Sequence, residues 1–289
     1  MGEFSYIRAS QINEAVDMLN ENGYNSRPLA GGTDLLLLLR NQPELCDRVV
    51  DITQIPELHR ILQEGNTVTI GAAATFTEVL SSAVIRKTAP LLAQACSLIG
   101  AVQIRNMGTI GGNVANAAAC ADSLPALVCL DAVARVLTPK QEFIWPVADL
   151  VVKPNQTLIP TGGLLVSFSY TIPKPGSRSF FNKLGRRNAM AISRLTVAVL
   201  GRVDNNGIII EARIVTGSAT PGICRLASAE TILLGQKPSP ALFAAAGRAV
   251  ADEMILLSGR RWSTEYKEPA IISMTSRALM KIFDVAETE

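Results

Sequence analysis

Two glycine pairs, each followed by residues suited to a helix, constrain the fold more than any other feature of this chain. The first lies in LAGGTDLLLLLR (residues 29–40) and the second in TIGGNVANAAACADSLPAL (residues 109–127). A glycine pair tolerates dihedral angles closed to other residues and carries no side chain that keeps a ligand away. Where a helix begins directly after it, the first N–H groups and the positive end of the helix dipole attract anions. Two such turns suit the two phosphates of a dinucleotide.

Each of these features has a purely structural alternative. Either glycine pair alone is equally well explained as a tight turn without a ligand. In the first segment Thr33 supplies a hydroxyl and Asp34 is expected to cap the helix. In the second, Asp122 either accepts hydrogen bonds from sugar-like hydroxyls or only caps the next helix. The five consecutive leucines are interpreted as a fully buried helix that ends before Pro43.

Composition and charge exclude several classes of function. The 289 residues are 48% hydrophobic and 18% charged, with a net charge of +2 and only 5% aromatic side chains, so nucleic acid is not an expected partner. No apolar run approaches the roughly 18 residues of a membrane span, and the N-terminus lacks the apolar core of a signal peptide. The five cysteines form no Cys-x-x-Cys pair, and one histidine is present, so no metal site is predicted. A cytoplasmic protein is expected.

The chain also lacks the common catalytic motifs. It has no Gly-x-Ser-x-Gly elbow, no phosphate-binding loop of the Gly-x(4)-Gly-Lys-[Ser/Thr] type and no Gly-x-Gly-x-x-Gly. We therefore assign no catalytic residue, and we expect any chemistry to be brought by a cofactor.

The pattern of apolar residues predicts an α+β protein of two units. A helix is expected over residues 10–23 with Ser10 as its cap, and others over 91–100 and 122–130. Hairpins are expected at 60–72 and at 194–219, where Asp204-Asn205-Asn206-Gly207 is the strongest turn signal. The apolar run at 162–173 closes the first unit, PKPGSRS has the composition of a linker, and the second unit combines an antiparallel sheet with helices.

Three motifs in order resemble one family. LAGGTDL, QIRNMGTIGGNVANAAACADSLPAL and FFNKLGRRNAMAIS are similar to segments of the FAD-binding medium subunit of molybdenum hydroxylases, the group of bacterial xanthine dehydrogenase and carbon monoxide dehydrogenase. The resemblance covers essentially the whole chain. Where relatives usually carry Ala-Ser-Pro before the aspartate, this chain has Ala117-Ala118-Ala119-Cys120. It also lacks the cysteine-rich insertion of the 4-hydroxybenzoyl-CoA reductase branch.

The resemblance implies a fold and a cofactor. It implies an FAD-binding domain of the vanillyl-alcohol oxidase (PCMH) type over residues 1–175, in subdomains of about 1–55 and 56–175. A small α+β C-terminal domain with a three-stranded antiparallel sheet and helices follows at 176–289. The residues expected to contact FAD are Arg27, Pro28, Leu29, Ala30, Gly31, Gly32, Thr33, Asp34, Ile99, Thr109, Ile110, Gly111, Gly112, Asn113, Asp122, Leu165 and Lys183. Three cations follow in this segment: Lys183, Arg186 and Arg187. The resemblance implies that they stabilise anionic flavin or contact the electron acceptor; the structural alternative is a solvated basic strand end.

The resemblance also implies partners. A molybdopterin-binding large subunit oxidises the substrate, and a small subunit with two [2Fe-2S] clusters passes electrons to the FAD of this chain, which delivers them to NAD or another acceptor such as ferredoxin or quinone. A dimer of heterotrimers is expected, and a purine is the first expectation for the substrate, with nicotinate, aldehydes and carbon monoxide behind. Two alternatives stay open: a self-sufficient FAD-dependent oxidoreductase of the same fold, and a non-catalytic scaffold subunit.

Overall fold

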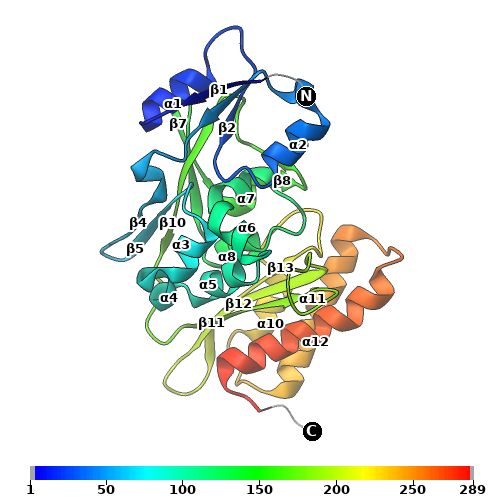
Figure 1. Cartoon of the computed structure of the whole chain (residues 1–289). Coiled ribbons are helices and arrows are strands. Elements are labelled where there is room, and N and C mark those ends of the chain that lie inside the picture. The colour runs from blue at the N-terminus through cyan, green and yellow to red at the C-terminus, as the bar shows by residue number, and fades with distance from the viewer. Residues whose placement is uncertain (1–3, 287–289) are drawn as a thin grey trace.

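The computed structural model describes residues 4–286, which form three main sheets in consecutive stretches of the chain (Figure 1). The first sheet is parallel, with the strand order β1-β3-β2. Its elements are β1 (Ser5–Arg8), α1 (Ile12–Leu19), β2 (Ser26–Leu29), α2 (Leu35–Asn41) and β3 (Arg48–Asp51). Short 3-10 turns at Pro43–Leu45 and Pro56–His59 flank β3. The N-cap of α1 is Gln11 rather than the predicted Ser10, whose N–H and hydroxyl both donate to Glu14.

The pentaleucine helix is not fully buried, so that expectation was wrong. In α2 only Leu39 is buried, whereas Leu36, Leu37 and Leu38 keep 45%, 61% and 44% of their surface exposed. Successive helical residues point about 100° apart, so a helix packed on one side cannot bury five neighbours in a row. The packed side of α2 contacts the small cluster around Cys46 and Val49.

The second sheet is antiparallel, with the strand order β4-β5-β10-β6-β7. Its strands are β4 (Ile61–Glu64), β5 (Thr67–Gly71), β6 (Val133–Leu137), β7 (Glu142–Pro146) and β10 (Leu164–Thr171). The helices of this stretch are α3 (Phe76–Ser81), α4 (Ala83–Thr88), α5 (Pro90–Ser97), α6 (Val102–Met107), α7 (Ile110–Asn116), α8 (Ser123–Cys129) and α9 (Val147–Leu150). A two-stranded ribbon, β8 (Val151–Lys153) with β9 (Gln156–Thr157), precedes β10.

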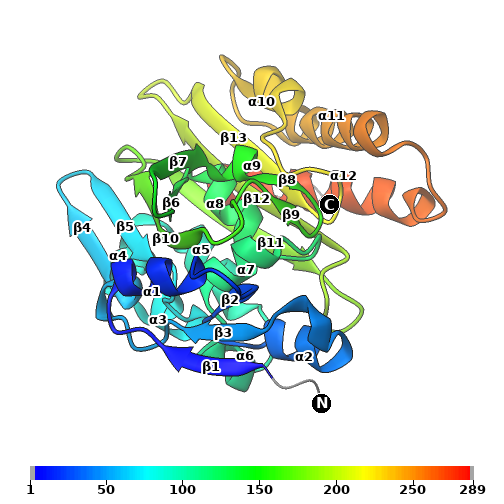
Figure 2. The same ribbon diagram turned by 90° about the horizontal axis from the view of Figure 1, so that it is seen from above.

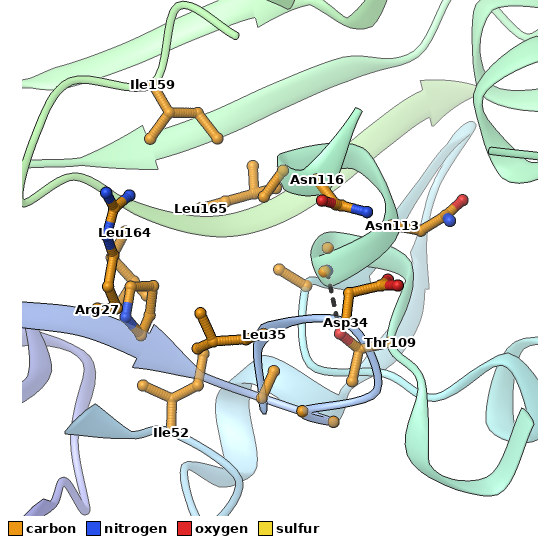
Figure 3. Close-up of a pocket in the computed structure, with 18 of the residues that line it drawn as sticks. Arg27, Asp34, Leu35, Ile52, Thr109, Asn113, Asn116, Ile159, Leu164 and Leu165 are labelled. Atoms are coloured by element: carbon orange, nitrogen blue, oxygen red, sulfur yellow. Dashed lines mark hydrogen bonds between the residues drawn. The ribbon is translucent and has the colours of Figure 1, made fainter. Parts of the chain in front are cut away.

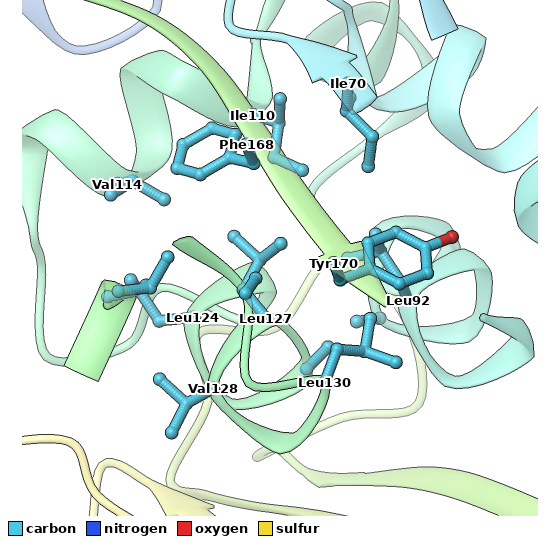
Figure 4. Packing of buried hydrophobic residues seen from close by; sticks show 14 of the residues in the cluster. Ile70, Leu92, Ile110, Val114, Leu124, Leu127, Val128, Leu130, Phe168 and Tyr170 are labelled. Atoms are coloured by element: carbon cyan, nitrogen blue, oxygen red, sulfur yellow. The ribbon is translucent and has the colours of Figure 1, made fainter. Parts of the chain in front are cut away.

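The main core lies between this sheet and the helices that cover it (Figure 4). Phe168 of β10 lies beside Ile110 of α7, and Tyr170 lies beside Leu92 of α5. The Tyr170 hydroxyl is satisfied by Thr88 at 2.7 Å, as a buried polar group requires. Burial raises the pKa of Tyr170 to about 12.

The third sheet lies between the main core and the C-terminal helices (Figure 2). It is antiparallel, with β12 (Leu195–Val203) between β11 (Arg178–Leu184) and β13 (Ile209–Gly217). Val197 and Val199 of β12 face the helices α10 (Ala227–Leu233), α11 (Pro240–Ser258) and α12 (Thr264–Phe283), while Ala198 and Leu200 join the main core. Both faces of the strand are therefore buried, which explains its unbroken apolar run.

The hairpin that joins β12 and β13 has the predicted turn. The Asp204 carboxylate accepts the N–H groups of Asn206 and Ile208, and Gly207 has a φ of +76°. Over residues 4–286, no helix is both long enough and apolar enough to cross a bilayer.

Candidate functional site

A cavity of about 690 Å³ opens between the first sheet and the middle sheet, and both glycine segments line it (Figure 3). The first glycine segment is the loop that leads from β2 into α2. The second is the beginning of α7. The loop that leads into β10 and the start of that strand form a third wall, where Ile159 and Leu165 lie across the space from Thr109. Two glycine turns about eighty residues apart in sequence thus share one cavity.

The first glycine segment lines this cavity and has N–H groups without a protein acceptor. Within the described chain, no main-chain N–H from Ala30 to Asp34 donates to a protein acceptor. Gly32 has a φ of +68°, which only glycine adopts without strain. Asp34 occupies the N-cap position of α2, but its side chain makes none of the capping bonds that were predicted. Consecutive free N–H groups in a loop of this kind form a concave site for an anion.

Gly31 is required for a different reason, a close approach of backbone. A Cβ atom at this position would lie 1.9 Å from the carbonyl oxygen of Met107 and 3.0 Å from the Cα of Gly108. The first glycine segment therefore packs directly on the residues that precede the second one. This contact sets the spacing of the two walls of the cavity.

The second glycine segment is not a cradle of free N–H groups, so that part of the prediction was wrong. The N–H groups of Ile110 and Gly111 donate to the carbonyls of Ala74 and Ala72 at 2.9 and 2.8 Å. The N–H of Gly112 donates to the hydroxyl oxygen of Thr109, the N-cap of α7, at 3.0 Å (Figure 3). This segment presents to the cavity the O–H of Thr109 and the bare backbone of Gly112. A Cβ atom added at Gly112 would meet only the Thr109 hydroxyl oxygen.

Most of the residues predicted to contact the cofactor line this one cavity. They are Arg27, Pro28, Ala30, Gly31, Gly32, Thr33, Asp34, Thr109, Gly111, Gly112, Asn113 and Leu165. Leu29, Ile99, Ile110, Asp122 and Lys183 do not line it. Leu29 packs around Cys46, and Ile110 is fully buried in the main core, with Ile99 at its edge. These three side chains pack in the apolar clusters and do not line the cavity.

Asp122 and Lys183 form a buried ion pair near the junction with the third sheet. The Lys183 Nζ lies 2.6 Å from an Asp122 carboxylate oxygen, with 8% and 5% of the side chains exposed, and it also donates to the carbonyl of Leu98. The Ser193 hydroxyl donates to the other carboxylate oxygen. Burial raises the pKa of the Asp122 carboxyl, and Lys183 opposes this effect.

This geometry contradicts two of the purely structural alternatives, the helix cap and the solvated strand end. Asp122 stands at the N-cap position of α8, but its side chain makes no capping bond, because its oxygens are taken by Lys183 and Ser193. Lys183 is not part of a solvated strand end, whereas Arg186 and Arg187 are exposed.

Apart from Leu165, the wall formed by the loop before β10 was missed from the sequence. This loop contains a third glycine pair, Gly162-Gly163, in the stretch PTGGLL. Gly162 has a φ of +74°, and its carbonyl accepts the side-chain amide of Asn20 at 2.8 Å. The pair was a usable signal that was interpreted only as the start of a strand. Asn116, which lies in α7 near Asn113, was missed as well.

Comparison with known families matches both halves of the chain. Residues 2–175 match the family described as the FAD binding domain in molybdopterin dehydrogenase. Residues 179–282 match the CO dehydrogenase flavoprotein C-terminal domain.

Similar proteins of known name cover the chain almost completely. The xanthine dehydrogenase FAD-binding subunit of Escherichia coli O157:H7 is 31% identical over 95% of this chain and 94% of its own length. The carbon monoxide dehydrogenase medium chain of Hydrogenophaga pseudoflava is 28% identical over 96% of each chain. A solved structure of carbon monoxide dehydrogenase from the same organism superposes with a TM-score of 0.90 at 27% identity, over 99% of each chain. The chain therefore belongs to the FAD-binding subunits of the molybdopterin dehydrogenases, the molybdenum hydroxylase family of oxidoreductases.

Proposed function

We propose that this chain is the FAD-carrying electron-transfer subunit of a xanthine dehydrogenase-like complex. It receives electrons from the [2Fe-2S] clusters of a partner subunit and passes them to NAD or another acceptor. The observation that carries the proposal is a cavity lined by the loop from Ala30 to Asp34, whose main-chain N–H groups have no protein acceptor. The similarity to a xanthine dehydrogenase FAD-binding subunit supports the type of complex.

The residues of the cavity fit the diphosphate of FAD. The free N–H groups of Gly31 to Asp34 are positioned to donate to one side of the diphosphate, and the Thr109 hydroxyl to the other. A larger side chain at Gly31 would separate these two walls. When bound, FAD supplies the chemistry of the site, because it accepts electrons one at a time and releases them as a hydride.

The chain's own residues bind and orient the cofactor. Leu165 and Ile159 form the apolar part of the wall, and Arg27 adds a cation at the end of the cavity near β2. Asp122 and Lys183 belong to the proposed binding set through the segments they hold together, since their ion pair ties α8 to β11. None of these roles needs an acid, a base or a nucleophile.

The proposed division of the chain follows the same interpretation. The FAD-binding unit comprises residues 1–175, with its subdomains divided near residue 55, and the C-terminal unit comprises 176–289. A molybdopterin-binding large subunit and a [2Fe-2S] small subunit are the proposed partners, in a dimer of heterotrimers. Relatives named as the medium chain of carbon monoxide dehydrogenase support a complex of several chains.

Purification of the chain with its co-expressed partners tests the proposal. We expect a flavin absorption spectrum that stays with this chain after the subunits are separated, and molybdenum and iron that stay with the partners. The substrate is then found by assaying the complex with purines, nicotinate and aldehydes against several electron acceptors. A colourless chain with no affinity for added FAD would contradict the proposal. Turnover of an organic substrate by this chain alone would favour the self-sufficient oxidoreductase instead.

A further inference from the structure

The turn at residues 159–163 is the least firmly held part of the third wall of the cavity. It connects the ribbon of β8 and β9 to β10, and each of its five residues lines the cavity. The chain on either side of the turn is anchored. The N–H of Leu158 donates to the carbonyl of Leu150 at 2.9 Å, and Leu164 pairs with Leu137 of β6.

Between these anchors, one hydrogen bond ties the turn to another segment. In the described chain, the Gly162 carbonyl accepts the Asn20 side-chain amide at 2.8 Å, and the other hydrogen bonds of the turn stay within residues 157–163. Ile159 packs against the edge of the main core and is only partly buried. A segment with few hydrogen bonds and few buried contacts opens at a lower free energy than the core around it.

The other two walls of the cavity are fixed by backbone. The first glycine segment meets the residues before the second one at Gly31 and Met107, with no side chain between them. The start of α7 is attached to the residues after β5 through the N–H groups of Ile110 and Gly111. The turn at 159–163 is therefore the wall that moves at the smallest cost in broken contacts.

Asn20 is placed to hold this turn. It is the C-cap residue of α1, and its side-chain amide donates to two carbonyls, that of Val16 at 2.7 Å and that of Gly162 at 2.8 Å. The first bond fixes the side chain on its own helix, and the second extends from there to the turn. Gly162 has a φ of +74°, so the backbone at the point of contact is the one that glycine adopts without strain.

We propose that the turn at 159–163 is a movable wall through which FAD enters and leaves, and that Asn20 is the positioning residue that holds it closed. This inference rests on the proposed function, because it takes FAD as the ligand of the cavity. Opening breaks the bond between Asn20 and Gly162 and changes the dihedral angles of a few turn residues, as in other loops that cover a binding site. Asn20 therefore controls how fast FAD is exchanged.

Release of FAD from the loaded full chain, followed by flavin fluorescence, tests the role of Asn20. Asn20→Ala should raise the release rate about three- to tenfold, the usual effect of one neutral hydrogen bond. Asn20→Asp keeps the shape of the side chain but has no N–H to donate, so it should raise the rate at least as much. Gln63→Ala is the matched control, because the Gln63 amide also donates to a glycine carbonyl, that of Gly65, and does not line the cavity. It should release FAD as the wild type does.

A reversible cross-link distinguishes a moving wall from a fixed one. A Cβ atom at Gly162 would lie 2.8 Å from the Asn20 Cγ, so cysteines at these two positions have their Cβ atoms within about 4.5 Å, the range that a disulfide spans. In the double variant Asn20→Cys/Gly162→Cys, the oxidised chain should take up and release FAD about tenfold or more slowly than the reduced chain, because opening is blocked. The reduced chain, which lacks the amide, should release FAD at least as fast as Asn20→Ala.

Two controls accompany these measurements. Wild-type chain treated with the same oxidant accounts for the five native cysteines and should exchange FAD at an unchanged rate. Melting temperatures of the same samples show whether a faster release comes from unfolding. A wild-type chain that takes up no FAD would contradict the proposed function itself. If FAD does bind, equal exchange rates in the oxidised and reduced double variant refute the moving wall, and wild-type release from Asn20→Ala and Asn20→Asp refutes the role of Asn20.

Discussion

Gly31→Ala is the substitution that most directly tests how the FAD cavity is built. The added Cβ would lie 1.9 Å from the Met107 carbonyl oxygen, where an ordinary contact is at least 3.4 Å, so one of the two segments must retreat by roughly 1.5 Å. The obstacle is backbone, and no side chain can rotate out of the way. Overpacking of this kind costs about 1–3 kcal/mol. If the two walls of the cavity move apart to relieve this strain, the Kd for FAD should rise about ten- to hundredfold.

The assay is reconstitution of the cofactor-free chain with FAD, followed by flavin fluorescence, with thermal unfolding measured in parallel. Gly222→Ala is the matched control, because a Cβ there meets no atom closer than 3.9 Å and its φ is not positive. It should bind FAD with unchanged affinity. Wild-type affinity in a folded Gly31→Ala protein would refute the argument that this contact sets the geometry of the site.

Three further changes test other parts of the structure. Lys183→Met leaves the buried Asp122 carboxylate unpaired and should lower the free energy of unfolding by about 3–5 kcal/mol at neutral pH. The pKa of Asp122 in the folded chain is already raised and would rise further without Lys183, so the carboxyl becomes protonated and neutral as the pH falls toward about 4. The loss of stability should therefore be smaller at pH 5 than at pH 8 in urea titrations, and equal losses would contradict this reasoning. Leu39→Ala should lower the free energy of unfolding by about 2–5 kcal/mol, and Leu37→Ala by less than about 0.5 kcal/mol. Equal losses would support a fully buried helix instead. Thr109→Val removes the N-cap of α7 and should lower the free energy of unfolding, measured with denaturant, by about 1 kcal/mol. An unchanged stability would show that the cap does not stabilise the chain.

Local signals in the sequence predicted the secondary structure where neighbouring residues determine it. The hairpin at Asp204 and Gly207 is specified by its own turn residues, and α1 by the spacing of its apolar positions. The five leucines carry no such spacing, because a continuous apolar run has no phase that marks a buried side. Only the packing of α2 on the first sheet selects Leu39.

The contacts that define the site depend on residues far apart in sequence. The acceptors that occupy the N–H groups of Ile110 and Gly111 are carbonyls of Ala74 and Ala72, and no motif at 109–113 reveals them. The ion pair of Asp122 with Lys183 likewise spans 61 residues.

The glycine segments were predicted as a pair of equal cradles, and their roles differ. The loop from Ala30 to Asp34 keeps its N–H groups free, whereas the start of α7 uses its own to attach itself to the residues after β5. We propose that the first segment is the anion site and that the second is the wall against which it is held. Glycine composition alone does not separate these roles, because both need a backbone without side chains.

An experimental structure of the FAD-loaded chain tests the central claim most directly. We predict diphosphate oxygens within about 3 Å of the main-chain N–H groups between Gly31 and Asp34, with the Thr109 hydroxyl on the opposite side. A diphosphate held elsewhere, with these N–H groups turned to solvent, would contradict it.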